Sequence, residues 1–346
     1  MDARLESMYR RFTWRILSNY VTPWEFEQLK AQITGYGQWC AAWSAHAARH
    51  VGRGDEAVAA GHTVTAADAY LRGTLAYHWA SFVFTHDEAQ FRAALADMDA
   101  ALGKAAPLQS PPVELLTVPF EGLSLPGYLR VPAGAQRPPV VVLLPGADSA
   151  KEELYNLADH VVRRGLAVAV FDGPGQGPVS FASNLRPDQE VAVRAILDAV
   201  TARPDVDGSR VAVGGISYGG LFSIRTAAAD ERVRAVVSVS SWYTPAGRFA
   251  EMDDLTRPGQ YLHHGPDPAA SMAAITLAGV AARATAPLLQ VYGGNDPGSP
   301  PAHAERIAAE YGGPVTTVVY PDGVHILNNV WNVARPLIAD WLADTL

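Results

Sequence analysis

The sequence predicts an α/β protein with a mostly parallel, eight-stranded sheet flanked by helices, preceded by an all-helical domain. Three observations predict this architecture. Residues 1–107 show helical periodicity, the remaining chain alternates short β-branched runs with helical stretches, and the proline-containing segment APLQSPP separates the two textures. Such alternation is typical of a parallel sheet covered by helices on both faces.

The N-terminal domain, residues 1–107, is predicted from apolar positions that recur at helical spacing, as at Ala67, Tyr70, Leu71 and Leu75. Five of the eight tryptophans lie in this part of the chain: Trp14, Trp24, Trp39, Trp43 and Trp79. Two interpretations stay open. The aromatic side chains either build the domain's own core and a dimer face, or form the aromatic wall of a cap over a flat substrate.

The second domain, residues 108–346, carries the predicted strands VELLTV, LPGYLRV, PPVVVLL, GLAVAVF, RVAVG, VRAVVSVS, PLLQVYG and PVTTVVY. Only Glu121 and Gly122 separate the first two runs, so these are expected to form an antiparallel hairpin. The connection 244–283 is longer than usual and contains a helical stretch. Long excursions of this kind are often functional, so we expect it to cap the active site.

Composition excludes several classes of function. The net charge is −8 and basic residues form no cluster, so no nucleic-acid partner is expected. No apolar stretch reaches the roughly 18 residues that a membrane span needs, and the N-terminus does not resemble a signal peptide. The single cysteine, Cys40, has no disulfide partner in the chain and is interpreted as a buried small side chain. We therefore expect a cytoplasmic protein that does not contact membranes.

The strongest local signal is the G-x-S-x-G pentapeptide centred on Ser217, between the strand RVAVG and the helical stretch LFSIRTAAA. This strand–turn–helix context is the one that a nucleophile elbow requires. The turn is so tight that we expect a strained backbone at Ser217. The helix that follows directs its N-terminus and the Tyr218 amide toward a reacting carbonyl, which predicts part of an oxyanion hole.

A serine hydroxyl needs a histidine to take its proton and a carboxylate to hold that histidine. Asp296 follows the seventh predicted strand and His325 follows the eighth, in the chain order typical of this elbow. The sequence therefore predicts an α/β-hydrolase fold with the catalytic triad Ser217, Asp296 and His325. Asp322 is a rival acid, but it lies only three residues before His325 and is better interpreted as a turn former.

The loop after the third predicted strand reads LLPGADSAKEE. Gly146 and Ala147 occupy the position that usually donates the second oxyanion-hole amide. The same loop also has the pattern of a capping box, with Ser149 at the N-cap of the next helix and Glu152 three residues later. Both interpretations are retained.

Two motifs are rejected as cofactor or metal sites, and none is expected elsewhere. FDGPGQG is interrupted by Pro174 and Pro178 and lacks the helix entry of a phosphate loop. His46 and His50 have the spacing of helical zinc ligands, but Ala47 stands where H-E-x-x-H needs glutamate. We interpret this pair as solvated or core histidines.

These motifs together carry a family resemblance. PGADSAKEE, DGPGQG, the serine elbow, GGND at 293–296 and GVH at 323–325 resemble the 2,6-dihydroxypseudooxynicotine hydrolase group, which is related to FrsA-like hydrolases and fungal heptaketide-shortening hydrolases. The resemblance covers most of the chain. It implies an N-terminal helical domain on an α/β-hydrolase, cleavage of a carbon–carbon bond beside a ketone in aryl or polyketide diketones, and a homodimer.

By the same resemblance, Ser217 is the nucleophile, His325 the general base and then acid, and Asp296 its orienting carboxylate. An additional acid near the sixth strand assists some members of the group. The corresponding stretch here, SSWYTPAGRFAEMDD, departs from that pattern. Its candidate for the acid is Glu251, and its substrate-binding candidates are Trp242, Tyr243 and Glu251.

The expected substrate is a small, neutral aromatic or polyketide-like ketone or ester, because no cluster of basic residues marks the elbow or its partner loops. Two alternatives stay open. One is a non-hydrolytic acyltransferase, dehydratase or cyclase of secondary metabolism that uses the same triad. The other is a catalytically retired ligand-binding protein with this fold.

Overall fold

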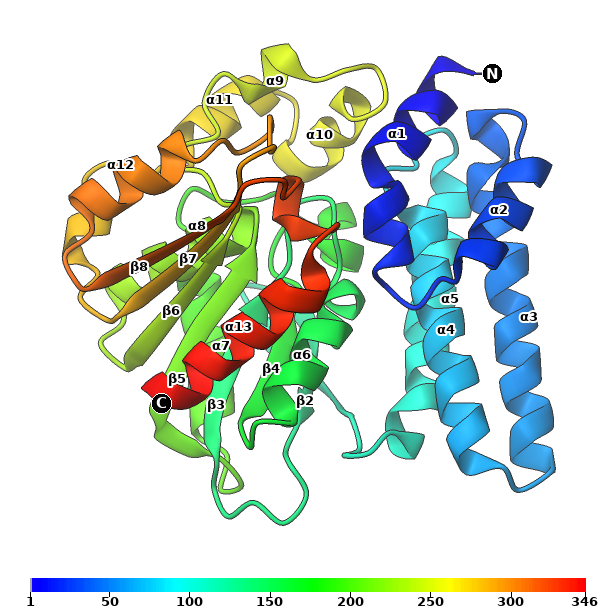
Figure 1. The fold of residues 1–346 in the computed structure, drawn as a ribbon, viewed down its shortest axis with the longest axis horizontal. Helices are drawn as coiled ribbons and strands as arrows, with labels where there is room; N and C mark the ends of the chain where they lie inside the picture. The colour runs from blue at the N-terminus through cyan, green and yellow to red at the C-terminus, as the bar shows by residue number, and fades with distance from the viewer. Residues whose placement is uncertain (1) are drawn as a thin grey trace. The chain divides into compact units, whose positions relative to one another are not determined.

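The structure is a computed structural model that describes residues 2–346. These residues form two compact units. One comprises the chain up to Leu115 together with Met252–Gly259, and the other comprises Leu116–Glu251 together with Gln260–Leu346. The predicted fold class is confirmed: the second unit is an α/β-hydrolase with a mostly parallel sheet, and the N-terminal region is helical (Figure 1).

The first unit consists mainly of the helices α1 (Ala3–Leu17), α2 (Pro23–Gln32), α3 (Trp39–Ala59), α4 (Thr63–Ser81) and α5 (Glu88–Ala105). α3 packs along α4, and α4 along α5. Gly54 permits the close approach of the first pair, because a Cβ at this position would lie 2.4 Å from the ring of Tyr70. α2 begins with a complete capping box, in which Thr22 and Glu25 bond each other's backbone N–H groups.

The tryptophans of this unit fall into two groups. Trp39, Trp43 and Trp79 are fully buried, and the rings of Trp39 and Trp43 lie 5.6 Å apart. The prediction that the aromatic residues build a core is therefore confirmed for these three. Trp14 and Trp24 are exposed by 57% and 72%.

A short piece of the long excursion belongs to the helical unit. Asp253 holds it on α1: its carboxylate accepts a hydrogen bond from the Ser7 hydroxyl at 2.8 Å and forms an ion pair with Arg11 at 3.0 Å. The same carboxylate accepts the Thr256 N–H at 3.1 Å. One carboxylate therefore orders the segment and attaches it to the first helix of the chain.

The strands of the second unit are β1 (Glu114–Phe120), β2 (Leu123–Arg130), β3 (Pro139–Leu144), β4 (Ala167–Phe171), β5 (Asp207–Ile216), β6 (Val233–Val239), β7 (Leu288–Gly293) and β8 (Val315–Tyr320). Their order in the sheet is β1-β2-β4-β3-β5-β6-β7-β8. β2 is antiparallel to β4, and all pairs from β4 to β8 are parallel. The hairpin predicted for the first two strands is present, since two residues connect neighbouring strands.

Helices and turns connect these strands: α6 (Tyr155–Val162), α7 (Glu190–Thr201), α8 (Tyr218–Ala229), α9 (Arg248–Glu251), α10 (Arg257–His264), α11 (Pro268–Ala274), α12 (Ala302–Glu310) and α13 (Trp331–Thr345). α6 packs with α13, and α7 packs with α8, so the two pairs cover opposite faces of the sheet (Figure 1). Every residue of β3, β4 and β7 is buried, as expected for parallel strands covered on both faces. Within residues 2–346, no helix combines the length and apolar composition of a membrane span.

Candidate active site

Ser217 lies in the turn between β5 and α8. Its backbone has φ +58° and ψ −120°, a region that costs a non-glycine residue about 1–3 kcal/mol. Its N–H donates to the Val239 carbonyl at 2.8 Å, which ties the turn to the neighbouring strand. Gly219 is required here, because a Cβ would lie 2.1 Å from the Leu144 carbonyl oxygen. The strained backbone that the pentapeptide predicts is therefore present.

Asp296 and His325 lie in the loops that follow β7 and β8, and they meet. His325 Nδ1 lies 2.7 Å from Asp296 Oδ2, while Oδ1 accepts the N–H groups of Gly298 at 2.8 Å and Ser299 at 2.9 Å. Because a carboxylate only accepts hydrogen bonds, Nδ1 carries the proton and Nε2 of the neutral ring keeps its lone pair. The geometry therefore leaves Nε2 able to act as a base.

Asp296 is almost fully buried, whereas a third of the His325 side chain is exposed. Burial by itself raises the pKa of the Asp296 carboxyl. The neighbouring His325 and the two amide donors outweigh that effect and hold the pKa below its ordinary value. Asp296 is therefore ionised at neutral pH.

Parallel pairing brings the loops around Ser217 together. Leu144 pairs with Gly215 at the end of β3, so the loop after β3 lies beside the elbow. A Cβ on Gly146 would lie only 3.6 Å from Ser217 Oγ.

Among residues 2–346, the Ser217 hydroxyl makes no hydrogen bond to His325. Such contacts are often long in enzymes without substrate and shorten when the substrate binds.

The backbone amides expected to form the oxyanion hole are available. In the described part of the chain, neither the Tyr218 N–H nor the Ala147 N–H donates a hydrogen bond. Tyr218 is also the first residue of α8, where the positive end of the helix dipole favours negative charge. The two amides flank Ser217 in sequence and across the β3–β5 pair.

Gln176 supports this loop, a role that the sequence did not reveal. Its side-chain Nε2 donates to the carbonyl oxygens of Pro145 at 2.6 Å and Gly146 at 3.1 Å, and its Oε1 accepts the Gly173 N–H at 2.9 Å. The motif DGPGQG, rejected as a phosphate loop, is thus a buried brace behind the oxyanion loop. In the sequence, the only feature that could have pointed to this role of Gln176 was the motif DGPGQG itself.

The predicted capping box after β3 is wrong. The 3₁₀ helix Lys151–Leu154 follows Ala150 without a side-chain cap, and the Ser149 hydroxyl bonds Glu153 instead. The Lys151 N–H donates to Asp172 Oδ1 at 2.8 Å. A residue from the next strand-end loop therefore satisfies the helix terminus, which a pattern confined to neighbouring residues does not reveal.

The three substrate-binding candidates differ in their surroundings. The Trp242 ring lies 5.7 Å from that of His325 and 4.9 Å from that of Tyr218. The Tyr243 hydroxyl donates to Glu310 at 2.6 Å. Glu251 is exposed and pairs with Arg248. Only Trp242 is thus in ring contact with a residue of the predicted triad.

Two polar atoms near the elbow were missed. The Tyr218 hydroxyl and His264 Nε2 are buried without a hydrogen-bond partner among residues 2–346, and their rings lie 5.4 Å apart. Burial lowers the pKa of His264 to about 3, so its ring is neutral at pH 7. Buried polar atoms without partners are uncommon and are often explained by a ligand, water or catalytic role.

Asp322, the rival acid, is exposed, and its carbonyl oxygen accepts the Asn329 side-chain amide at 2.8 Å. No hydrogen bond joins it to His325 among the described residues. The carboxylate that contacts the histidine is that of Asp296.

Two protein families match this chain. A profile of the FrsA-like esterases matches residues 18–249, and a profile of the prolyl oligopeptidase family matches residues 156–345. The chain belongs to the FrsA-like esterase and prolyl oligopeptidase families. Each of the two family matches covers more than half of this chain. The chain is therefore an enzyme of the α/β-hydrolase class.

This hydrolase is similar to proteins of bacteria and fungi. 2,6-Dihydropseudooxynicotine hydrolase of Paenarthrobacter nicotinovorans is 28% identical over 324 residues, which cover 89% of this chain and 84% of that protein. The crystal structure of a 2,6-dihydroxy-pseudo-oxynicotine hydrolase superposes with a TM-score of 0.87 at 26% identity, covering 96% and 95% of the two chains.

The alpha/beta hydrolase PydG of Acremonium sp. is 36% identical over 220 residues, 60% of this chain and 51% of that protein. The chain therefore matches about half the length of this fungal relative. The family resemblance that the motifs carry is confirmed.

Proposed function

We propose that this hydrolase cleaves a carbon–carbon bond beside a ketone, with Ser217 as nucleophile, His325 as base and Asp296 as its orienting carboxylate. The observation that carries the proposal is the 2.7 Å contact between Asp296 and His325 Nδ1, made by the loops that follow β7 and β8 in the same sheet whose strand β5 ends at the strained Ser217. The similarity to pseudooxynicotine hydrolases along most of the chain supports the choice of bond. An ester of an aromatic or apolar compound is the second substrate class that the same residues serve.

In the proposed reaction, His325 Nε2 takes the Ser217 hydroxyl proton as Oγ attacks the ketone carbon. The N–H groups of Tyr218 and Ala147 stabilise the oxyanion of the tetrahedral intermediate. Collapse breaks the carbon–carbon bond, and the departing carbon takes the electron pair and the proton from His325. Water, deprotonated by His325, then attacks the acyl group on Ser217 and releases a carboxylic acid.

A 1,3-diketone suits this mechanism because the departing carbon leaves as an enolate. Trp242 offers a flat apolar surface beside His325, and the Tyr218 hydroxyl and His264 Nε2 offer polar contacts. These residues support an aromatic or polyketide-like substrate that carries polar groups beyond the reacting carbonyl. We also propose a cytoplasmic homodimer, for which the exposed rings of Trp14 and Trp24 are the candidate apolar contacts.

The test compares wild type with Ser217→Ala on an aryl 1,3-diketone and on a p-nitrophenyl ester. Removing the nucleophile should lower kcat by at least about 10³-fold. An unchanged rate on both substrates would exclude the proposal. Turnover of the ester alone would leave the triad and reject the carbon–carbon bond as its target.

Two further measurements separate the alternatives. Hydrolysis in ¹⁸O-labelled water must place solvent oxygen in the acid product, whereas acyl transfer, dehydration or cyclisation does not. A fluorophosphonate probe should label wild type and fail to label Ser217→Ala. A wild-type chain that the probe does not label would favour a ligand-binding protein.

A further inference from the structure

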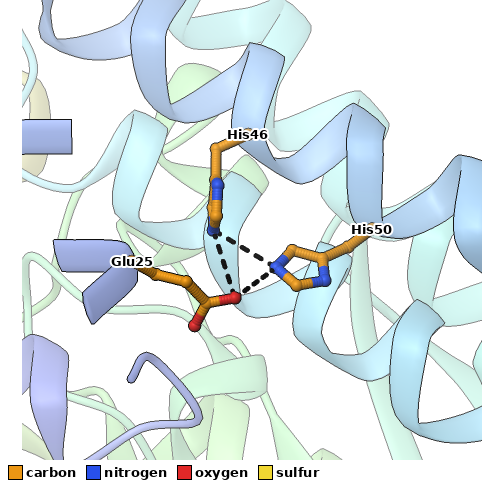
Figure 2. A group of neighbouring side chains, drawn as sticks. All are labelled: Glu25, His46 and His50. Carbon is orange, nitrogen blue, oxygen red and sulfur yellow. Dashed lines mark hydrogen bonds and ion pairs between the residues drawn. The ribbon is translucent and has the colours of Figure 1, made fainter. Parts of the chain in front are cut away.

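Three side chains of the helical unit converge on one point. Glu25 lies in the first turn of α2, and His46 and His50 lie four residues apart on α3, so both rings point from the same helix face (Figure 2). His50 Nε2 lies 3.1 Å from Glu25 Oε1 and 3.2 Å from His46 Nε2, and His46 Nε2 lies 3.8 Å from the same carboxylate oxygen. Both histidines are buried.

With neutral rings, the contacts among these three side chains cannot all be hydrogen bonds at the same time. Both rings are buried, and a neutral imidazole carries a single N–H. The guanidinium of Arg49, a donor only, lies 3.0 Å from His46 Nδ1, which places the His46 proton on Nε2. That proton faces His50 Nε2.

Neither protonation state of His50 satisfies every contact. If Nε2 carries the proton, it can donate to Glu25, but two N–H groups then face each other across 3.2 Å. If Nε2 is unprotonated, it accepts a hydrogen bond from His46, but two acceptors, His50 Nε2 and Glu25 Oε1, then face each other across 3.1 Å. A cation between the three atoms removes the conflict, because all three then direct lone pairs at it.

The spacing of the three atoms suits a small cation. Separations of 3.1, 3.2 and 3.8 Å leave a point about 2.0 Å from each atom, near the bond length of Zn²⁺ to imidazole nitrogen and carboxylate oxygen. Two imidazoles and one carboxylate are a donor set that binds Zn²⁺ and its first-row neighbours, with a further position left for water.

Glu25 is also held in place from its other side. Its Oε2 accepts the Thr22 N–H at 2.9 Å and the Thr22 hydroxyl at 2.7 Å, which leaves Oε1 directed at the histidines. Such outer contacts orient metal ligands and strengthen binding. The capping box of α2 therefore fixes one ligand, and α3 supplies the other two.

We propose that Glu25, His46 and His50 bind one divalent first-row transition-metal ion, for which Zn²⁺ is the probe. The ion would link α2 to α3 within the helical unit. Binding requires the His46 proton to move to Nδ1, so the exposed Arg49 must swing away from that atom. Arg49 is therefore expected to weaken metal binding, both through this contact and through its positive charge.

The experiment uses the full chain, treated with EDTA, dialysed and titrated with Zn²⁺ by calorimetry. Wild type should bind one Zn²⁺ per chain that both Glu25→Gln and His50→Gln fail to bind, and its Tm should rise by roughly 5 °C at saturating Zn²⁺. His62→Gln, which removes an exposed histidine of the same unit, is the matched control and should keep the ion. Arg49→Ala should lower the Kd for Zn²⁺ several-fold.

Comparing variants separates this ion from any bound at His325. Equal Zn²⁺ uptake by wild type, Glu25→Gln and His50→Gln, all folded by circular dichroism, would overturn the proposal. If both variants unfold, Co²⁺ binding to wild type decides. A visible d–d spectrum that intensifies in Arg49→Ala supports the site, and no such spectrum in either protein rejects it.

Discussion

The two units each place histidine against a carboxylate, and they do so differently. In the α/β unit, one oxygen of Asp296 faces one histidine, His325, while its other oxygen is held by two backbone amides. In the helical unit, one oxygen of Glu25 faces two histidines, His46 and His50 (Figure 2). The same residue types therefore build a pair in one unit and a converging cluster in the other.

The difference comes from the elements that carry the residues. Loops after parallel strands bring one side chain from each strand end to a shared edge, so Asp296 and His325 meet one to one. A helix instead repeats its face every three to four residues, so His46 and His50 reach the same carboxylate together. A one-to-one pair orients a base, whereas a converging cluster suits a cation.

Asp296→Asn should produce the largest change in activity. The oxygen of the asparagine amide would stay with the two backbone N–H groups, and its NH₂ group would face His325 Nδ1. That arrangement favours the tautomer with the proton on Nε2, so kcat should fall by about 10⁴-fold. Asp322→Asn, the matched control, should keep kcat within a few-fold. Steady-state kinetics on the substrate that wild type turns over provide the measurement. A large loss in Asp322→Asn with an active Asp296→Asn would reverse the assignment.

Asp172→Ala should produce the largest change in stability. This carboxylate is fully buried, accepts the Lys151 N–H at 2.8 Å and lies 3.5 Å from the Lys151 ammonium. Removing it leaves the Lys151 N–H without this acceptor and leaves the ammonium with one carboxylate, that of Glu152 at 2.6 Å, so the free energy of unfolding should fall by about 3 kcal/mol. Urea denaturation measures it. Asp172→Asn, which keeps an acceptor, should lose less, and equal losses would argue against the electrostatic explanation.

Gln176→Ala tests whether the brace behind the oxyanion loop acts on catalysis. We expect a loss of about 1–3 kcal/mol in unfolding free energy, together with a several-fold fall in kcat and little change in KM. Gln109→Ala is the control from the helical unit, since Gln109 also donates to a backbone carbonyl, that of Ala67 at 3.0 Å. It should lose stability without losing kcat. If kcat and KM fall equally in Gln176→Ala and Gln109→Ala, Gln176 does not position the oxyanion loop for catalysis.

Asp253→Asn should produce the smallest effect, and only above acidic pH. Although partial burial raises the pKa of Asp253, hydrogen bonds from Ser7 and Thr256 and the charge of Arg11 outweigh it and lower the pKa to about 2. A carboxyl group whose pKa is lower in the folded than in the unfolded chain stabilises the fold at any pH above its unfolded pKa. That stabilisation is lost as the pH falls from about 4 to 2.

Because Asp253 is partly exposed, its contribution is below about 1 kcal/mol. Urea denaturation of wild type and Asp253→Asn should therefore differ at pH 7 and converge near pH 2. A difference that does not change with pH would show that the ionised carboxylate does not attach this segment to α1.

The sequence alone determined the fold class, most strands and the elbow. Continuous β-branched runs predict buried parallel strands, and a two-residue connection at Glu121 and Gly122 predicts a hairpin, because these patterns depend on residues adjacent in the chain. The strain at Ser217 follows for the same reason, since five residues must turn a strand into a helix.

Only the tertiary structure decided the contacts between distant residues. It showed that Asp296 rather than Asp322 contacts His325, that Asp172 replaces the predicted cap at Ser149, and that Gln176 braces the oxyanion loop. It also brought Glu25 to the histidine pair, although the absence of a glutamate at position 47 had argued against a metal site. Hydrogen bonds of this kind depend on where the folded chain returns, and no local pattern records that position.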